Sequence, residues 1–318
     1  MSRLATSRYS SVISVCLRYL KDDIDRRIPS ILGKRGYSNR FSASEAGKNG
    51  PSTVDGHPSS TIAEVEGNVH ALESLSGVDG PGLRYMIFLQ GCAYRCKFCS
   101  NPNSWAFHDG DGEMMTSREI GHKLSRVAGY LTRGGGGVTL SGGEPMLQPD
   151  FAAAIFQEAH QLGLHTCIDT TGQGSRHHHW DKVLPHTDLV LLCTKSTDAR
   201  IYEWITGGHR QEHMLHFAEE VGRRNIPLWL RYVLVPGITD RAIDLDWLQH
   251  FAETHPTLEM VDILPYHKLG EAKWAAMGIP YPFQGQRSPT RTELENFGDD
   301  LRQRLAQHHV QVQYAQGV

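Results

Sequence analysis

The chain has 318 residues, a formal net charge of −3 and six cysteines. This charge gives no broad attraction to nucleic acid, and no stretch approaches the roughly 18 consecutive apolar residues that a membrane helix needs. The length suits one large α/β domain or two ordinary ones. Three of the cysteines, Cys16, Cys167 and Cys193, stand far apart without a repeated spacing. This pattern argues against a disulfide scaffold and for a reducing compartment.

The first 60 residues differ in composition from the rest. Residues 1–43 contain nine Lys or Arg against three acids and are rich in Ser, which is typical of an organellar transit peptide. The stretch Arg35–Ser38 resembles a mitochondrial processing site, which favours a mitochondrion or related organelle over a plastid. The acids Asp22, Asp23 and Asp25 leave open a basic tail of a cytoplasmic protein. Residues 44–64 are expected to form a flexible linker, and residues 65–318 the folded domain.

From Arg84 onward, short apolar runs alternate with helical patterns. The runs are rich in Val, Leu and Ile and mostly do not alternate with polar residues, as expected for parallel strands covered by helices. This order predicts right-handed βα units and a barrel or partial barrel. The predicted strands are 85–89, 138–140, 164–168, 189–192, 228–235, 260–264 and 310–314. The predicted helices are 118–131, 150–162, 211–224, 244–254 and 290–308.

Three cysteines follow the first run at C-x3-C-x2-C spacing: Cys92, Cys96 and Cys99. This spacing lets one loop turn three thiolates toward one centre, and soft sulfur ligands suit iron–sulfur or zinc. Structural zinc sites and electron-transfer clusters usually have four protein ligands, and the fourth is missing locally. One iron could then bind a small chelating molecule. The spacing alone leaves open three buried reduced cysteines, or a zinc site completed by a distant His.

Chemically distinctive residues also follow the other five runs. Because ligands bind at the carboxyl ends of the strands in such folds, all six loops are expected to face one mouth. This convergence favours a catalytic cluster over a passive one. The loops are the cysteine loop, Ser141–Pro145, Asp169–Gly172, Cys193–Lys195, Pro236–Gly237 and Pro265–His267.

The cysteine motif and the loop Gly142-Gly143-Glu144 together resemble the signature of the radical S-adenosylmethionine (SAM) enzymes. More narrowly, the chain from about Val69 to Tyr314 resembles the pyruvate formate-lyase-activating enzymes of the glycyl-radical-enzyme activating family. No further cysteine lies between Cys99 and Ser141, so a single cluster is expected. The matching segments are Val78–Arg84, Phe88–Cys92, Gly135–Thr139, Ser141–Glu144, His165–Thr170, Trp229–Gly237 and Leu264–Gly270.

The resemblance implies a fold, a reaction and partners. The fold would be a partial (β/α)6 TIM-like barrel after a disordered N-terminal extension. The family holds one [4Fe-4S] cluster on the three cysteines and binds SAM at the open iron. Reductive cleavage of SAM gives a 5′-deoxyadenosyl radical, which removes a hydrogen from a glycine of pyruvate formate-lyase. An electron donor such as flavodoxin or ferredoxin and a monomeric state are expected, with no nucleic-acid or membrane partner. The alternatives are another glycyl radical enzyme or a small-molecule substrate.

The resemblance also assigns roles to residues, and no catalytic side chain is expected beyond the cluster and SAM. Lys195 and Arg231 could pair with the SAM carboxylate or form a structural salt bridge with an acid such as Asp169. The expected SAM contacts are Phe98, Ser100, Gly142, Gly143, Glu144, Cys193, Thr194, Lys195, Arg231 and His267.

Three further positions could serve the partner or a cation. Asp79 either helps to seat the glycine loop of the partner or forms a structural turn. Asp169 and Thr170 match positions that in the family help to bind a monovalent cation beside SAM. Cys193 stands where another acidic oxygen is expected, and a thiol is a poor ligand for a hard cation, so this cation site is doubtful.

Overall fold

The computed structural model describes residues 62–108, 110–174 and 179–314. Contacts divide the chain into two units, residues 1–60 and 61–318. The transit-peptide prediction and nearly all of the linker prediction therefore lie outside the described residues. Among the described residues, no helix combines the length and apolar character needed to cross a membrane.

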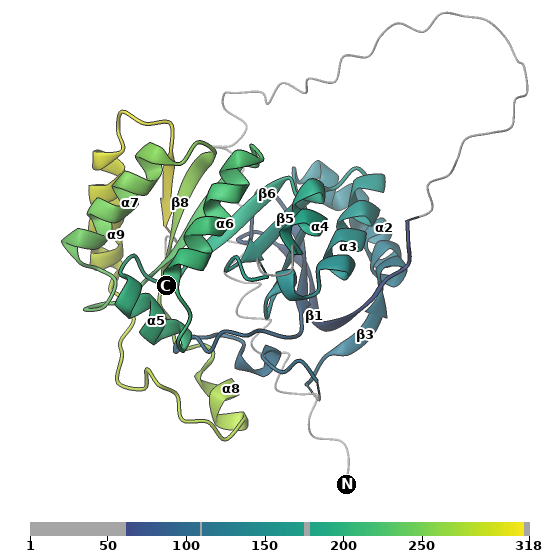
Figure 1. The fold of residues 1–318 in the computed structure, drawn as a ribbon, viewed down its shortest axis with the longest axis horizontal. Coiled ribbons are helices and arrows are strands. Elements are labelled where there is room, and N and C mark those ends of the chain that lie inside the picture. Colours follow the sequence, from purple (N-terminus) through teal and green to yellow (C-terminus); the bar gives the residue numbers. More distant parts are fainter. Residues whose placement is uncertain (1–61, 109, 175–178, 315–318) are drawn as a thin grey trace, which may run out of the picture. The chain divides into compact units, whose positions relative to one another are not determined.

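One nine-stranded sheet runs through the described residues in the order β3-β1-β2-β4-β5-β6-β7-β8-β9 (Figure 1). From β2 onward neighbouring strands are parallel, whereas β1 is antiparallel to both β2 and β3. The order ends at β3 and β9, so the sheet is an open, partial barrel. The strands are β1 (Glu66–Ser76), β2 (Arg84–Leu89), β3 (Glu113–Thr116), β4 (Gly137–Gly142), β5 (His165–Thr170), β6 (Leu189–Thr194), β7 (Leu228–Leu234), β8 (Leu258–Pro265) and β9 (Gln311–Tyr314).

The six parallel strands predicted after Arg84 and the final strand are confirmed. Strands β1 and β3 were not predicted. β1 is an edge-side strand whose pattern of mostly partly buried and exposed residues carries little apolar signal, and β3 has only four residues. The partial-barrel fold class is confirmed.

The five predicted helices are present, each within a few residues of its expected ends. Figure 1 shows α2, α3 and α4 on the side of β5, and α6, α7 and α9 on the side of β6 and β8. Three short helices were missed, because five to eight residues give little periodicity. The helices are α2 (Ser117–Arg133), α3 (Pro149–Gln161), α4 (His179–Val183), α5 (Ala199–Thr206), α6 (Gln211–Arg223), α7 (Ala242–Thr254), α8 (Glu271–Ala276) and α9 (Arg291–Arg304).

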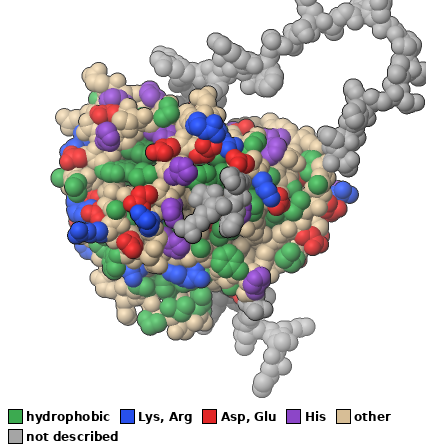
Figure 2. All heavy atoms as spheres, viewed as in Figure 1, with side chains coloured by type: hydrophobic (Ala, Val, Ile, Leu, Met, Phe, Trp, Pro, Cys, Tyr) green, Lys and Arg blue, Asp and Glu red, His purple; other side chains and the backbone are tan. Residues whose placement is uncertain are grey.

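Strand register brings polar residues together inside the barrel. Cys193 on β6 lies opposite Arg231 on β7, and Arg231 lies opposite Asp262 on β8. These side chains are buried or nearly so. On the outer surface, acidic and basic side chains are interspersed on the face that Figure 2 shows, in keeping with the small net charge.

Candidate active site

A cavity of about 240 Å³ lies at the carboxyl ends of the parallel strands. Residues from the ends of β2, β4, β5, β6, β7 and β8 line it. At β7 the lining residue is Val233 rather than the predicted Pro236 and Gly237, so five of the six expected loops reach the cavity. The predicted site residues that line it are Cys92, Cys96, Phe98, Cys99, Ser100, Gly142, Gly143, Asp169, Cys193, Lys195 and His267.

The other predicted site residues do not line this cavity. They are Glu144, Thr194, Arg231, Asp79 and Thr170. Each is instead engaged with protein groups; the Thr194 hydroxyl, for example, donates a hydrogen bond to the Ser196 carbonyl at 3.1 Å. The expected SAM contacts of Glu144, Thr194 and Arg231 therefore stay predictions, because these residues lie outside the lining of the cavity.

Hydrogen bonds to its backbone hold the cysteine loop against three other segments. The Cys92 amide donates to the Trp105 carbonyl at 3.1 Å, and the Lys97 amide donates to the Ile205 carbonyl at 2.9 Å. The indole of Trp274 on α8 donates to the Cys99 carbonyl at 2.9 Å. The loop is thereby fixed along its length while its three sulfurs stay free of disulfides.

Burial determines the acidity of the three thiols. It raises the pKa of Cys92 to about 12 and also raises the pKa values of Cys96 and Cys99, with the Lys195 ammonium opposing the rise for the last two. A soft metal centre would therefore displace protons on binding. Within the described ranges, no three His, Cys, Asp or Glu side chains are arranged to hold a single metal ion.

Lys195 places a cationic group in the cavity. Its ammonium nitrogen lies 6.0 Å from the centroid of the Phe98 ring. Burial opposes the charged form, but the neighbouring Cys193, Cys96 and Asp169 raise the pKa of Lys195 above its ordinary value. This group can pair with a ligand carboxylate.

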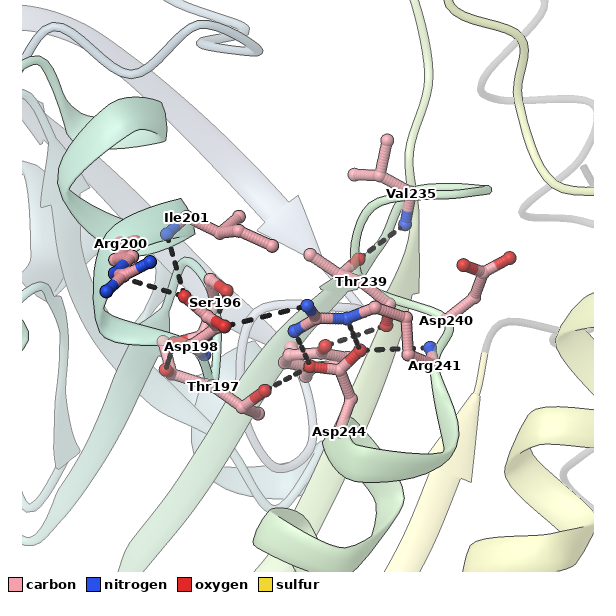
Figure 3. Close-up of polar contacts among 12 residues, drawn as sticks. Ser196, Thr197, Asp198, Arg200, Ile201, Val235, Thr239, Asp240, Arg241 and Asp244 are labelled. Carbon is pink, nitrogen blue, oxygen red and sulfur yellow. Dashed lines mark hydrogen bonds and ion pairs between the residues drawn. The ribbon is translucent and has the colours of Figure 1, made fainter.

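The chain that follows Lys195 is anchored to the start of α7 (Figure 3). The Arg241 guanidinium donates two hydrogen bonds of 2.9 Å to the fully buried Asp244, and it lies 3.6 Å from Asp198. The Thr197 hydroxyl also donates to Asp244. These contacts fix the loop two residues beyond Lys195.

His267 and Phe98 supply the ring surfaces of the cavity. The amide of Leu269 donates to Nδ1 of His267 at 3.3 Å, so a neutral ring carries its hydrogen on Nε2. Burial lowers the pKa of His267, which favours that neutral form. Phe98 is nearly buried and packs edge-on against Phe283 with centroids 6.0 Å apart.

At Gly142 and Gly143 the neighbouring backbone leaves no room for a Cβ atom. A Cβ at Gly143 would lie 2.3 Å from the Gly91 carbonyl oxygen, and a Cβ at Gly142 would lie 2.5 Å from the Leu89 amide nitrogen. Gly142 also has φ +105°, which disfavours other residues. The missing side chains therefore let the end of β4 pack against the end of β2, beside the cavity that both glycines line.

Glu144 joins two loops beneath the cavity. Its carboxylate accepts hydrogen bonds from the Thr170 and Thr171 hydroxyls at 2.6 and 2.7 Å, and from the amides of Thr171 and Met146 at 2.9 and 3.1 Å. Burial raises the pKa of Glu144, and these four donors oppose the rise. The residue holds the loop after β4 against the loop after β5.

Arg231 lies in a buried ion network. It is 3.3 Å from Asp169, 3.4 Å from Asp79 and 3.4 Å from Asp262. The structural salt bridge, left open by the sequence, is therefore the arrangement present. Burial raises the pKa of Asp262 although Arg231 opposes it. The pKa of Asp169 is lowered, because Arg231 and Ser141 outweigh its burial.

The donors around Asp169 and Thr170 do not fit a monovalent cation site. Asp169 accepts hydrogen bonds from the Ser141 hydroxyl at 2.7 Å and from the Cys193 thiol at 3.2 Å. Burial raises the pKa of Cys193 to about 12, so the thiol keeps its hydrogen. The Thr170 hydroxyl is directed to Glu144. Donors thus occupy the oxygens that a cation would need.

Comparison with known proteins assigns the family. The model of the Radical SAM superfamily matches residues 86–245, which include the three cysteines and Lys195. The chain belongs to the radical SAM superfamily. It is 40% identical over 230 residues to the pyruvate formate-lyase-activating enzyme of Staphylococcus epidermidis, covering 71% of this chain and 91% of that protein. The enzyme of the same name from Staphylococcus aureus strain USA300 is 39% identical over the same shares.

Two solved structures share the fold. SuiB of Streptococcus suis bound to S-adenosylmethionine superposes with a TM-score of 0.54 at 13% identity, over 72% of this chain and 48% of that one. A radical SAM methyltransferase of Sphaerobacter thermophilus superposes with a TM-score of 0.54 at 15% identity, over 74% of this chain and 67% of that one. At these identities the likeness concerns the fold alone. The Staphylococcus relatives place the chain in the family of the pyruvate formate-lyase-activating enzymes.

Several residues at this radical SAM site were not predicted. Tyr94 and Trp105 line the cavity close to the motif, and Thr171 lines it beside Asp169. Thr171 belongs to a loop that the sequence had singled out, so a signal existed. Gln173 contacts Cys92, and nothing in the sequence indicated it.

Proposed function

We propose that this chain activates pyruvate formate-lyase by reductive cleavage of SAM at a [4Fe-4S] cluster. The observation that carries the proposal is the set of three cysteines at C-x3-C-x2-C spacing on one loop that borders a cavity. The identity of the partner rests on the names of relatives that are 39–40% identical over 91% of their length.

The donor set fits the cofactors. Cys92, Cys96 and Cys99 would ligate the cluster, whose thiolate ligands this family supplies in threes. Lys195 would pair with the SAM carboxylate, and Phe98 and His267 offer ring faces to its adenine. When bound, the cluster supplies one electron for the cleavage of SAM, which generates the radical that takes a hydrogen from the partner's glycine. The residues that line the cavity would shield that radical from water.

The decisive test is a mixing experiment. Anaerobically reconstituted protein is combined with SAM, a strong reductant and pyruvate formate-lyase, and the glycyl radical is measured by electron paramagnetic resonance. The proposal predicts the radical and an equal release of methionine. Cleavage of SAM without the radical would point to another glycyl radical enzyme or a small molecule. Replacing the chemical reductant by reduced flavodoxin or ferredoxin tests the proposed electron donor, and sedimentation tests the proposed monomer.

We also propose that residues 1–43 direct the chain to a mitochondrion or related organelle. The Arg-rich, Ser-rich composition supports this proposal. Residues 1–60 fused to a fluorescent protein should collect in the organelle and be cleaved. Replacing Arg3, Arg8 and Arg18 by Glu should leave the fusion in the cytoplasm, and a diffuse wild-type fusion would contradict the proposal.

A further inference from the structure

The side-chain amide of Gln173 reaches the first cysteine of the motif. Gln173 lies three residues beyond the end of β5, and its Nε2 is 3.7 Å from Cys92 Sγ and 3.0 Å from Thr171 Oγ1. The Trp180 indole donates to the Gln173 carbonyl at 2.8 Å. Because Trp180 is buried and packs on Phe217 at 5.0 Å, the backbone at Gln173 is held in place.

The hydrogen bonds around Thr171 determine which end of the amide faces Cys92. The Thr171 hydroxyl donates its one hydrogen to Glu144 at 2.7 Å, so its oxygen must accept from Gln173. That partner has to be the amide nitrogen, whose second hydrogen is then available to the sulfur. The amide oxygen of Gln173 is buried and has no partner among the described residues. No hydrogen bond to this oxygen therefore favours the opposite orientation, in which Oε1 and Nε2 exchange places.

We propose that Gln173 is a positioning residue that donates an N–H···S hydrogen bond to Cys92 when Cys92 ligates the cluster, and so raises the reduction potential of the cluster. Glu144 orients Thr171, Thr171 orients Gln173, and Gln173 bonds the sulfur. Hydrogen bonds to the ligand sulfurs stabilise the more negative, reduced cluster. The inference rests on the proposed function, because it requires a cluster on Cys92.

The test is a redox titration of the full-length, reconstituted protein. The electron paramagnetic resonance signal of the reduced cluster measures the reduced fraction at each potential. Gln173→Leu keeps the approximate volume and removes the donor. We expect a midpoint potential lower by about 59 mV, which is a tenfold shift in a one-electron equilibrium. Gln173→Glu, which adds a carboxylate beside Thr171, should lower the midpoint further.

The matched control is Gln157→Leu on α3. The Gln157 amide contacts His186 at 2.8 Å, and Gln157 does not line the cavity. The cluster of this variant should therefore have the same midpoint potential as the cluster of the wild type. A general loss of packing would not reproduce this difference between the two Leu variants. Equal midpoints for the wild type and Gln173→Leu, in protein that holds a cluster, would overturn the inference and leave the proposed function standing.

A second measurement uses the wild-type protein alone, so it does not depend on whether a variant takes up the cluster. After exchange into deuterium oxide, electron–nuclear double resonance of the reduced wild-type protein should show a strongly coupled exchangeable deuteron from the Gln173 amide, which selective ¹⁵N labelling of glutamine side chains identifies. Absence of a coupled glutamine nitrogen would overturn the inference. Wild-type protein that takes up no cluster at all would overturn the proposed function together with it.

Discussion

Two loops meet beside the cavity, the cysteine loop of residues 92–99 and the loop of residues 171–174 after β5. In the cysteine loop the backbone is hydrogen-bonded to neighbouring segments, whereas the buried thiols are left to bind a soft metal centre. At the end of β5 and in the loop after it, the side chains themselves are bonded: Thr170, Thr171 and Gln173 all donate.

The two loops therefore differ in role: the cysteine loop offers groups that can bind a metal centre, and the loop after β5 supports them. One loop offers reactive groups, and the other holds Glu144 and reaches back to Cys92. Substitutions in the first loop should therefore abolish the centre, and those in the second should change its stability and properties in graded steps.

The largest effect is expected for Cys96→Ala. Removal of one of three thiolates leaves too few ligands, so the iron content after anaerobic reconstitution and the cleavage of SAM should both fall to background. Cys167→Ala is the matched control, because Cys167 is also fully buried but does not line the cavity. It should retain iron and activity, and full activity of Cys96→Ala would contradict the assignment.

A large but graded effect is expected for Glu144→Ala. The substitution leaves two hydroxyls and two amides without their acceptor, and each buried group left unpaired costs roughly 1–3 kcal/mol. The free energy of unfolding, measured in urea, should fall by about 3 kcal/mol or more. Glu219→Ala, at an exposed position of α6, should change it little. Equal values for the two variants would show that Glu144 does not join the loops.

A smaller loss is expected for Gly143→Ala. The added Cβ would lie 2.3 Å from the Gly91 carbonyl oxygen, and overpacking of this kind costs about 1–3 kcal/mol. Gly129→Ala on α2 is the control, because its Cβ meets no atom within 4 Å and alanine favours a helix by about 1 kcal/mol. The free energy of unfolding, measured in urea, should therefore fall for Gly143→Ala and rise for Gly129→Ala. A change in the same direction for both variants would contradict the packing argument.

An effect of similar size, but one that depends on pH, is expected for Asp169→Asn. Burial opposes the charge, but Arg231 and Ser141 lower the pKa of Asp169 below 3.8. The carboxylate thus stabilises the fold above pH 3.8, and this contribution is lost as the pH falls through the lowered value. At neutral pH the free energy of unfolding, measured in urea, should be higher for the wild type than for the variant by about 1.5–3 kcal/mol. The gap should narrow below pH 3.8, and a constant gap would contradict the account.

The sequence predicted the residues that line the cavity better than the residues that support them. Cysteine spacing and the residues after each apolar run predicted which loops meet, because parallel strands bring their carboxyl ends to one edge. Glu144 and Arg231 were predicted to contact SAM, and the structure places both against protein partners outside the cavity lining. Sequence does not reveal whether a charged side chain faces a cavity or a buried partner. Gln173 carried no signal, because its contact with Cys92 depends on tertiary packing through Trp180.

The most direct test of the account asks whether SAM binds the cluster in this cavity. Electron–nuclear double resonance of the reduced, reconstituted protein with SAM labelled by ¹⁷O and ¹³C at its carboxylate measures that contact. The account predicts couplings from the label to the cluster in the wild type and weaker or altered ones in Lys195→Met. A reduced cluster that shows no coupling to the labelled SAM would contradict it.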